Sequence, residues 1–558
     1  MAFQVSPGVQ VKEIDASGVI PAVSTSIGGF AGSFNWGPVE EVRTVGSETE
    51  LASIFGKPDS NTYKYFLTAA SFLKYGNALK VVRAKSGHLN AADGTAKLIK
   101  NRDHFETGEI THDGTFVARY PGKLGNSLKV VICPADATAW AAFTQADSFD
   151  GQPGTSDTAT LYEHTKDELH VAVVDTDGSW SGTAGTVLET FQFVSQASDS
   201  VKSDGQSNYY KEVINRTSRY VYSVGHPAAL TDCGESLAGQ TAATAYVTGT
   251  AAISVDLALG TDDNTPTTGE IGDGFDLLAD AETIDVNLLF AYPDANSAKT
   301  IADKLIEICE ARKDCMAFVS PPIEDSVGTD TPAANVKTWA DTLPSTSYAA
   351  TDSGAVYVYD KYNDVYRWLG AAGLCAGLCA NTDDVADAWF SPAGVNRGQL
   401  FGVTKLAYNP KKADRDTLYK ARVNPLVSFP GQGTMLFGDK TLLSKPSAFD
   451  RINVRRLFIV LEKAVATAAK AQLFEFNDEF TRAQFRNMLE PFMRDVKGRR
   501  GMTDFRVICD TTNNTGQVID ANRFVADIFI KPSRSINFIS LNFIATRTGV
   551  DFSEIAGS

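Results

Sequence analysis

Histidine is the side chain best suited to acid–base catalysis near neutral pH, and this chain of 558 residues has only six. All of them precede residue 227, at positions 88, 104, 112, 164, 170 and 226. The sequence contains no Gly-x-Ser-x-Gly nucleophile elbow, no His-Glu-x-x-His zinc motif and no Gly-x4-Gly-Lys-Ser/Thr phosphate loop. We therefore predict no catalytic residues and no cofactor.

Cysteines and paired acidic residues are the remaining candidates for a metal site. The seven cysteines are sparse and odd in number, which is typical of free buried thiols in a reducing compartment. Cys375 and Cys379 share one helical face without a histidine or further cysteine nearby, so we interpret them as small core residues. Asp262-Asp263 and Asp383-Asp384 are single acidic pairs in turn-like sequence, which predicts caps or turns rather than calcium ligands. We expect no metal.

Six basic side chains near the C-terminus define a different kind of site: Arg482, Arg486, Arg494, Lys497, Arg499 and Arg500. Arg482 and Arg486 are i, i+4 neighbours off the apolar face of a predicted helix, and residues 497–500 form a basic loop. Two interpretations stay open, a positively charged contact surface or a solvated face with local pairs such as Arg486–Glu490. Nucleic acid is not an expected partner, because the net charge of the chain is −16.

The negative charge is concentrated in one segment. Residues 89–283 hold 11 Lys and Arg against 28 Asp and Glu, whereas the rest of the chain holds 40 against 39. Residues 451–510 are mildly basic, with 12 basic side chains against 8 acidic ones. This polarity would suit a subunit with an acidic exterior and a basic inner surface, although solubility alone explains an acidic segment equally well.

Alternating strands and helices must position these side chains. Before residue 89 the pattern predicts a helix over Tyr63–Tyr75 and a strand over Ala78–Arg83. The alternation resumes after residue 283, with a strand over Val286–Tyr292, a helix over Ser297–Arg312 and a strand over Met316–Ser320. We interpret these two parts as one discontinuous α/β domain. The stretch between them is rich in Gly, Ser, Thr and Asp, and its short apolar runs at 128–132, 169–174 and 190–194 predict one or two mostly-β domains.

The C-terminal part is the most helical. Asp450 is expected to cap a helix that runs to about Phe476, and Asn477 a second helix. The buried face of the second helix would comprise Phe485, Met488, Leu489, Phe492, Met493 and Val496. Pro491 predicts a kink or a restart in it. Strands are expected over Phe505–Cys509 and Arg523–Ile530.

Both ends of the chain have the pattern of single strands without a local partner. The apolar residues concerned are Val5, Val9, Val11 and Ile14 at one end and Ile536, Phe538, Ile539, Leu541, Phe543 and Ile544 at the other. Such strands pair either within their own chain or with a sheet of a neighbouring copy, which would hold them through main-chain hydrogen bonds.

Motifs spread in order along nearly the whole chain resemble those of contractile phage tail sheath proteins. They are Ser6-Pro-Gly-Val-Gln-Val-Lys-Glu-Ile-Asp15, Gly28-Gly-Phe-Ala-Gly-Ser-Phe-Asn-Trp-Gly-Pro38, Arg119-Tyr-Pro-Gly-Lys-Leu-Gly-Asn126, Asp204-Gly-Gln-Ser-Asn-Tyr-Tyr210, Trp389-Phe-Ser-Pro-Ala-Gly394, Phe476-Asn-Asp-Glu-Phe-Thr-Arg482 and Ile544-Ala-Thr-Arg-Thr-Gly549. No single motif is diagnostic, but together they make the resemblance specific.

The resemblance implies a multidomain α+β fold. We expect an N-terminal extended arm over 1–20, a middle α/β domain over 21–88 and 284–395, and an acidic outer insertion over 89–283. A helical C-terminal inner domain would cover 396–535 and a C-terminal arm 536–558. The arms would complete the sheet of the inner domain in neighbouring subunits.

The resemblance also implies a structural role rather than an enzymatic one. The expected subunit polymerises helically around a tail tube in a metastable extended state and contracts to drive the tube through the host envelope for genome delivery. Its partners would be other copies of the chain, the tail tube, which the six basic side chains would contact, and baseplate and tail terminator proteins.

The expected location is the virion, after assembly in the host cytoplasm. The sequence predicts neither membrane insertion nor a secretory signal. Two alternatives stay open: the sheath of a phage-tail-like bacteriocin or secretion apparatus, and a soluble α/β enzyme with a β insertion.

Overall fold

The computed structural model describes residues 24–108, 113–230, 234–246 and 249–537. They form two compact units. The larger comprises residues 22–388 and 392–463, and the smaller includes residues 389–391 and the chain from 464 onward. The boundary falls inside helix α12 (Ile452–Ala469). Within the described ranges, no helix is both long enough and apolar enough to cross a membrane.

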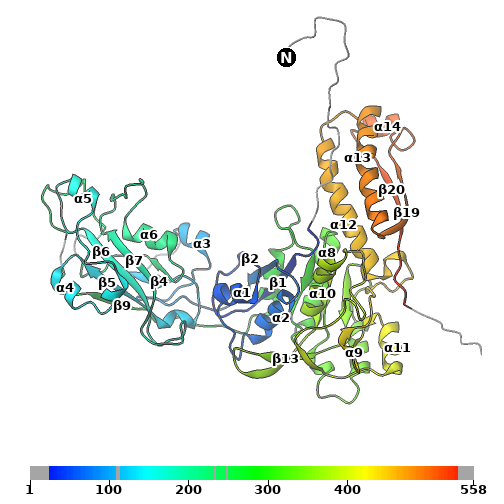
Figure 1. The fold of residues 1–558 in the computed structure, drawn as a ribbon, viewed down its shortest axis with the longest axis horizontal. Helices are drawn as coiled ribbons and strands as arrows, with labels where there is room; N and C mark the ends of the chain where they lie inside the picture. The colour runs from blue at the N-terminus through cyan, green and yellow to red at the C-terminus, as the bar shows by residue number, and fades with distance from the viewer. Residues whose placement is uncertain (1–23, 109–112, 231–233, 247–248, 538–558) are drawn as a thin grey trace, which may run out of the picture. The chain divides into compact units, whose positions relative to one another are not determined.

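A seven-stranded sheet lies at the core of the larger unit (Figure 1). Its order is β16-β12-β11-β10-β1-β3-β2, and every neighbouring pair is parallel except β3 with β2. The strands are β1 Gly28–Gly32, β2 Val42–Val45, β3 Leu79–Arg83, β10 Leu288–Phe290, β11 Met316–Val319, β12 Ala349–Asp352 and β16 Val423–Asn424. Segments from both sides of the acidic stretch therefore share one sheet, with β1 and β10 as neighbours.

Helices cover both faces of this sheet. On one face, α2 (Tyr63–Leu73) packs against α10 (Ala372–Val385), and on the other α7 (Thr268–Asp276) packs against α8 (Ala298–Arg312). The close approach of α2 explains Gly28, because a Cβ there would lie 2.8 Å from the Phe72 ring. The helices and strands predicted on either side of the acidic stretch are confirmed.

The reversal of strand order between β1 and β10 is the place where doubly wound sheets usually bind a ligand, at the carboxyl ends of the strands. Here aromatic side chains fill it. Phe34 is buried with its ring centroid 4.8 Å from that of Phe55, and the rings of Tyr65 and Tyr292 meet edge-on at 5.7 Å. Beside these rings Lys64 pairs with Asp294 at 2.7 Å, with its ammonium 5.1 Å from the Tyr65 centroid and 5.5 Å from that of Tyr292, so the charged groups here are engaged with each other and with the rings.

Most of the acidic stretch folds into a β-rich lobe, while its end forms α7 on the seven-stranded sheet. Its main sheet is antiparallel with the order β7-β6-β5-β9, formed by Thr186–Ser195, Glu168–Asp175, Leu128–Pro134 and Ile253–Asp256. A second pair joins β4 (Phe116–Ala118) to β8 (Val221–Ser223), and α6 (Tyr210–Thr217) packs on β7 and β8. The three predicted β runs of this stretch are confirmed. Its short helices are α3 Arg102–Glu106, α4 Ala137–Ala141 and α5 Asp157–Leu161.

The rest of the larger unit surrounds the seven-stranded sheet. A three-stranded antiparallel sheet has the order β14-β13-β15, formed by Val365–Leu369, Val356–Asp360 and Val403–Leu406. A hairpin pairs β17 (Leu426–Phe429) with β18 (Gly433–Leu436). The larger unit also contains the helices α1 Glu48–Phe55, α9 Pro332–Asp341 and α11 Lys412–Lys420.

Asp352, the last residue of β12, is a buried acid whose ionisation opposes folding. It is 3% exposed and accepts hydrogen bonds from Ser320 Oγ at 2.5 Å and from the Gly354 amide at 2.9 Å. Burial raises its pKa to about 7. In the unfolded chain the same carboxyl has a pKa of about 4, so it loses its proton earlier there as the pH rises. The free energy of unfolding should therefore fall between pH 4 and pH 7, by about 4 kcal/mol from this group.

The variant Asp352→Asn should lose that contribution to the pH dependence, since an amide does not ionise in this range. Urea unfolding at pH 5 and pH 7.5 measures it: the difference in unfolding free energy between the two pH values should shrink by about 2.5 kcal/mol relative to the wild type. Asp384→Asn, at an exposed position of α10, is the matched control and should keep the wild-type difference. Equal differences in all three proteins would contradict the prediction.

The smaller unit contains α13 (Glu479–Gly498), α14 (Gly516–Asp520) and a sheet of two strands, β19 (Met502–Ile508) and β20 (Asp527–Pro532). The prediction of a helix to Phe476 is wrong in extent, because α12 ends at Ala469 and a 3₁₀ turn over Lys470–Gln472 follows. Beyond it, Phe474 has a left-handed backbone (φ 71°), which cannot continue the helix.

Two further details of α13 differ from expectation. Its N-cap is Asp478 rather than Asn477, and the Asp478 carboxylate accepts from the Thr481 amide at 2.7 Å. Pro491 neither breaks nor restarts the helix, which is continuous over twenty residues. Pro491 is exposed, and so is Asn487, whose carbonyl loses its helical donor, so solvent is available to satisfy that carbonyl.

Candidate interaction surface of the C-terminal unit

The sheet of the smaller unit has the geometry of a strand acceptor. β19 and β20 pair antiparallel, with Phe505 opposite Ile530 and Val507 opposite Ile528. In the part of the chain that the structure describes, no third strand joins either outer edge. A two-stranded sheet is marginally stable by itself, and α13 supports this one by packing against β19. Both outer edges therefore present backbone groups that an incoming strand could bind.

The residues predicted to form the incoming strands are mostly not described. Ile536 is described and is 82% exposed. The other nine lie outside the described residues: Val5, Val9, Val11, Ile14, Phe538, Ile539, Leu541, Phe543 and Ile544. Their role in strand exchange stays a prediction.

All six basic residues lie on α13 or in the turn that follows it, and five of them are exposed or half-exposed. Arg494 pairs with Glu490 at 2.9 Å, Lys497 with Asp504 at 3.0 Å and Arg499 with Asp495 at 3.7 Å. The sequence suggested an ion pair of Arg486 with Glu490, but in the structure Glu490 pairs with Arg494. Exposed pairs of this kind contribute less than about 1 kcal/mol, so a stronger partner could replace them. The remaining two of the five are Arg486 and Arg500.

Arg482 differs from the other five because it is buried. It is 7% exposed, and its guanidinium donates to the Asn477 carbonyl at 3.0 Å and to Asn477 Oδ1 at 2.7 Å. Asn477 in turn donates from Nδ2 to the Arg523 carbonyl at 2.8 Å. The expectation that Arg482 points away from the apolar face is wrong. Through Asn477, Arg482 connects the segment before α13 with the segment before β20.

Arg482→Met should destabilise the smaller unit by about 1.5–3 kcal/mol, the usual contribution of hydrogen bonds to a charged group. Limited proteolysis at rising urea concentration measures the effect, with cleavage expected first between residues 470 and 480. The matched variant Arg486→Met removes the same charge four residues along α13, from a half-exposed side chain, and should change stability by less than about 0.5 kcal/mol. Equal effects of the two substitutions would contradict the role assigned to Arg482.

An exposed apolar segment precedes α13 and was missed from the sequence. We call residues 473–480 the aromatic–acidic segment. Leu473, Phe474, Phe476 and Phe480 are 63%, 105%, 84% and 75% exposed. Glu475, Asp478 and Glu479, also exposed, lie among them. The sequence does carry a signal for this exposure. Residues 474–480, Phe-Glu-Phe-Asn-Asp-Glu-Phe, lack a helical period and follow the end of an apolar helical pattern. Exposed clusters of large apolar side chains mark interaction sites.

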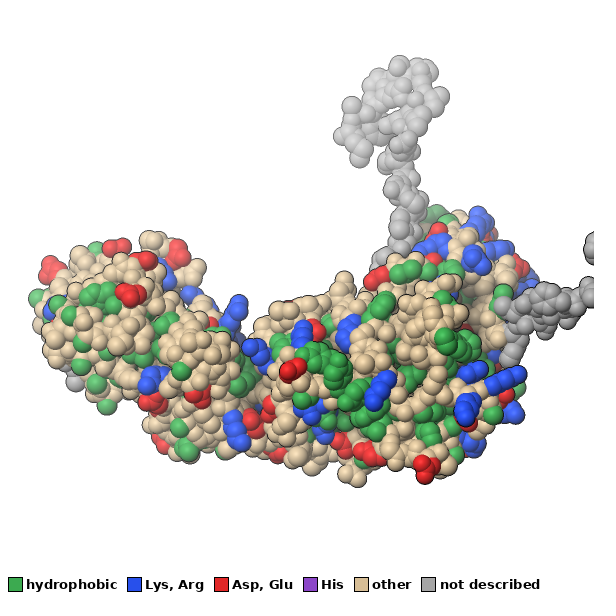
Figure 2. Space-filling model, turned by 60° about the horizontal axis from the view of Figure 1, so that its bottom comes forward, with side chains coloured by type: hydrophobic (Ala, Val, Ile, Leu, Met, Phe, Trp, Pro, Cys, Tyr) green, Lys and Arg blue, Asp and Glu red, His purple; other side chains and the backbone are tan. Residues whose placement is uncertain are grey.

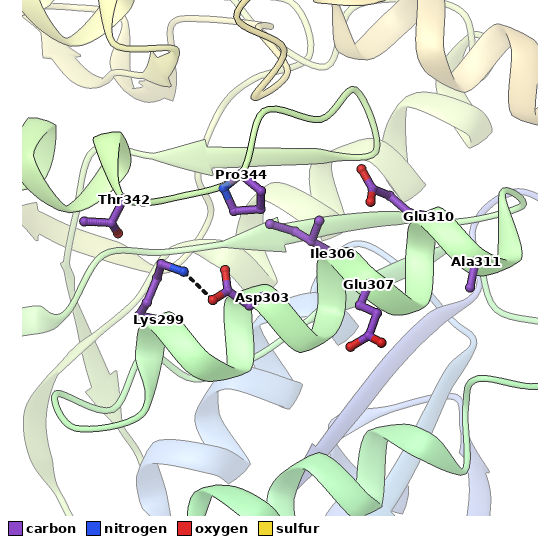
Figure 3. Close-up of a pocket in the computed structure, with 8 residues that line it drawn as sticks. All are labelled: Lys299, Asp303, Ile306, Glu307, Glu310, Ala311, Thr342 and Pro344. Atoms are coloured by element: carbon purple, nitrogen blue, oxygen red, sulfur yellow. Dashed lines mark hydrogen bonds and ion pairs between the residues drawn. The ribbon is translucent and has the colours of Figure 1, made fainter.

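The larger unit has an open groove of about 650 Å³ beside α8 (Figure 3). Glu307, Glu310 and an ion pair of Lys299 with Asp303 line it, together with Ile306 and Pro344. It holds no histidine, cysteine or serine that could act as a nucleophile. Across the described residues, no group of three or more His, Cys, Asp and Glu side chains is placed to hold a metal ion. The groove offers negative charge without a catalytic arrangement.

Three family descriptions match the chain in order. They are the tail sheath protein Gp18 domain III N-terminal region over residues 25–84, the phage tail sheath protein central domain over 267–442 and the phage tail sheath C-terminal domain over 444–546. The β-rich lobe lies between the first two matched ranges.

Whole proteins agree with these matches. The tail sheath proteins of Vibrio phage KVP40 and Enterobacteria phage T4 are each 33% identical to this chain, over 99% of it and 99% of the relative. The fold is similar to that of the sheath tail protein Lin1278 from Listeria innocua (TM-score 0.53, 12% identity, 93% of this chain and 97% of that one). It is also similar to the anti-feeding prophage helical sheath in the contracted state (TM-score 0.53, 13% identity, 98% and 100%). The chain belongs to the phage tail sheath protein family, whose members are structural components of virions.

Proposed function

We propose that this protein is the repeating subunit of a contractile phage tail sheath. It would assemble helically around the tail tube in an extended, metastable state and contract to drive the tube through the host envelope for genome delivery. The observation that carries this proposal is the similarity to two phage tail sheath proteins over 99% of the chain. The role requires no cofactor and no catalytic step, and it would place the protein in the virion after assembly in the host cytoplasm.

The open sheet of the smaller unit supports strand exchange as the connection between subunits. Residues 1–20 and 536–558 would be the arms, and β19 and β20 of neighbouring copies would receive them. Because donor and acceptor are different surfaces of one chain, the contact is heterologous and generates an open helix rather than a closed dimer. Linked arms would keep neighbours connected while the folded units move during contraction. The extended state would persist through a kinetic barrier.

Within such a sheath, we assign residues 396–535 to the inner side and the acidic lobe within 89–283 to the outer side. The assignment follows charge, since the lobe carries the negative excess and α13 carries exposed basic side chains. Baseplate and tail terminator proteins would bind the two ends of the polymer.

Arg486, Arg494, Lys497, Arg499 and Arg500 would contact an acidic tail tube, whereas Arg482 would position the chain before them. The double reversal Arg486→Glu with Arg500→Glu should lower the amount of sheath that sediments with purified tubes at least tenfold at physiological salt, because it places like charges at the contact. The control Lys412→Glu with Lys420→Glu changes the net charge equally at exposed positions of α11 and should sediment normally. Equal sedimentation of both variants would remove the tube contact from this surface.

Electron microscopy of the full-length protein expressed alone tests the function itself. Hollow, regularly striated tubes are the expected result. If only small particles form, purified tubes and baseplates should be added as templates. A protein that stays monomeric in their presence would overturn the proposed function.

A further inference from the structure

One face of the β14-β13-β15 sheet carries a row of four aromatic rings, two of them exposed and two half-buried. Tyr357 lies opposite Trp368 and Tyr359 opposite Tyr366 in the register of β13 with β14. The centroids of Tyr357 and Trp368 are 4.5 Å apart, and those of Tyr359 and Tyr366 are 5.2 Å apart. We call these four residues and Lys405 the aromatic face. Figure 2, which brings the bottom of Figure 1 forward, shows hydrophobic side chains gathered in the region of β13 with Lys and Arg side chains beside them.

Alternation along the strands separates this face from the core. Val356, Val358 and Leu369 point to the other side and are buried, whereas Tyr359 and Tyr366 are 48% and 49% exposed. The outer face of a half-buried antiparallel sheet is normally polar. Cross-strand ring pairs stabilise a hairpin by only about 1 kcal/mol each, which does not require leaving four large rings in contact with water. An apolar row of this kind favours an interaction surface.

Lys405 gives the aromatic face a positive charge. Its ammonium lies 4.6 Å from the centroid of the Tyr357 ring and 5.4 Å from that of Trp368. Lys405 has no carboxylate partner among the described residues, although the nearby Lys361 pairs with Glu48 at 3.3 Å. A ligand with both aromatic and acidic groups would therefore gain ring contacts and a charge pair at the same place.

The aromatic–acidic segment of the smaller unit has that composition. Phe474, Phe476 and Phe480 supply rings, and Glu475, Asp478 and Glu479 supply negative charge. Arg482 donates to Asn477 Oδ1, and Asn477 Nδ2 donates to the Arg523 carbonyl, so the backbone of the segment is fixed before binding. Binding of its rings would therefore lose little conformational entropy. The aromatic face and the aromatic–acidic segment thus carry opposite charges.

We propose that the aromatic face of one copy of this chain binds the aromatic–acidic segment, residues 473–480, of a second copy. The inference rests on the proposed function, because only a polymer brings many copies together. Two different surfaces of one chain that fit each other make a heterologous contact, which continues from copy to copy. This contact is separate from strand exchange, since it uses side chains on a sheet face rather than the backbone of a sheet edge.

A charge exchange tests the pairing. Lys405→Glu and Glu475→Lys should each raise the protein concentration needed for tube formation at least fivefold, and the combined variant should restore it to within twofold of the wild type. Lys337→Glu, on α9, is the control and should behave as the wild type. The pairing would be overturned if both single variants are impaired and the combined variant does not recover. It would also be overturned if the single variants assemble normally.

Photo-crosslinking locates the contact directly. A benzophenone side chain at position 476, or at 474 in a second variant, should react within residues 356–369 or 403–406 of another copy in assembled tubes. Mixing with isotope-labelled protein distinguishes reaction between copies from reaction within one. Three results would overturn the inference: crosslinks to other parts of the chain, crosslinks within one copy, or no crosslinks with either variant. Wild-type protein that forms no tubes even with templates would instead count against the proposed function.

Discussion

Replacing Arg456 with methionine should lower the unfolding free energy of the larger unit by about 3–5 kcal/mol, because it leaves a buried carboxylate without its cation. The Arg456 guanidinium lies 2.7 Å from Asp383 Oδ2, and both side chains are almost fully buried. Arg456 also donates to the carbonyls of Cys379 and Thr25, each at 3.1 Å. The Thr25 hydroxyl donates to the same carboxylate oxygen at 2.5 Å. One guanidinium therefore ties α12 to α10 and to the chain that leads into β1.

Urea unfolding followed by tryptophan fluorescence measures the loss. Lys337→Met breaks the exposed pair with Asp341 in the same unit and should cost less than about 1 kcal/mol. The double variant Arg456→Met with Asp383→Leu replaces both charges by apolar groups and should regain most of the stability, since a buried pair often contributes little beyond an apolar pair of similar volume. A double variant no more stable than Arg456→Met alone would show that the hydrogen bonds to Thr25 and Cys379 dominate instead.

Deleting residues 1–20, or everything after Ser535, should abolish tube formation and leave a folded monomer. The first cut lies before the first described residue, and the second lies beyond β20, so every helix and strand that the structure describes stays intact. Each deletion removes one donor strand per subunit, and an open polymer held by strand exchange cannot continue without it.

Sedimentation velocity and electron microscopy separate assembly from folding, and circular dichroism checks that the monomer is folded. The control Val9→Ile with Val11→Ile keeps β-branched side chains at two positions of the proposed arm and should assemble. Regular tubes from either truncated protein would refute strand exchange as the essential connection.

Local signals predicted much of the larger unit. The helical spacing of residues 63–75 and 297–312 and the β-branched run before Arg83 correspond to α2, α8 and β3. What local signals could not give is which distant strands join. β16 has two residues, Val423 and Asn424, and is part of the seven-stranded sheet only because Thr351 lies beside it in the folded chain. Short strands are defined by their neighbours and carry too little pattern of their own.

The interaction surface was predictable in part. Composition indicated a basic C-terminal region. All six of its side chains lie on or just after α13, and five of them are at least partly exposed. The burial of Arg482 was not predictable, because it depends on Asn477 standing in front of the helix rather than capping it. The continuity of α13 through Pro491 likewise depends on which side of the helix the proline faces. In both cases tertiary surroundings decide between local alternatives.

The chain leaves for the β-rich lobe and returns from it at almost the same point. Leu89 and Thr261 exchange two backbone hydrogen bonds, of 3.2 Å and 3.1 Å. A segment whose ends meet in this way can be exchanged for another folded module with adjacent termini without moving the strands on either side. Several contacts would need substitutes. The Pro121 carbonyl accepts from the buried Arg83 guanidinium at 2.8 Å, the Lys100 carbonyl accepts from the Val39 amide at 2.9 Å, and Trp36 packs edge-on against Tyr120 and Trp180. A foreign domain could therefore replace the lobe and be displayed once per subunit.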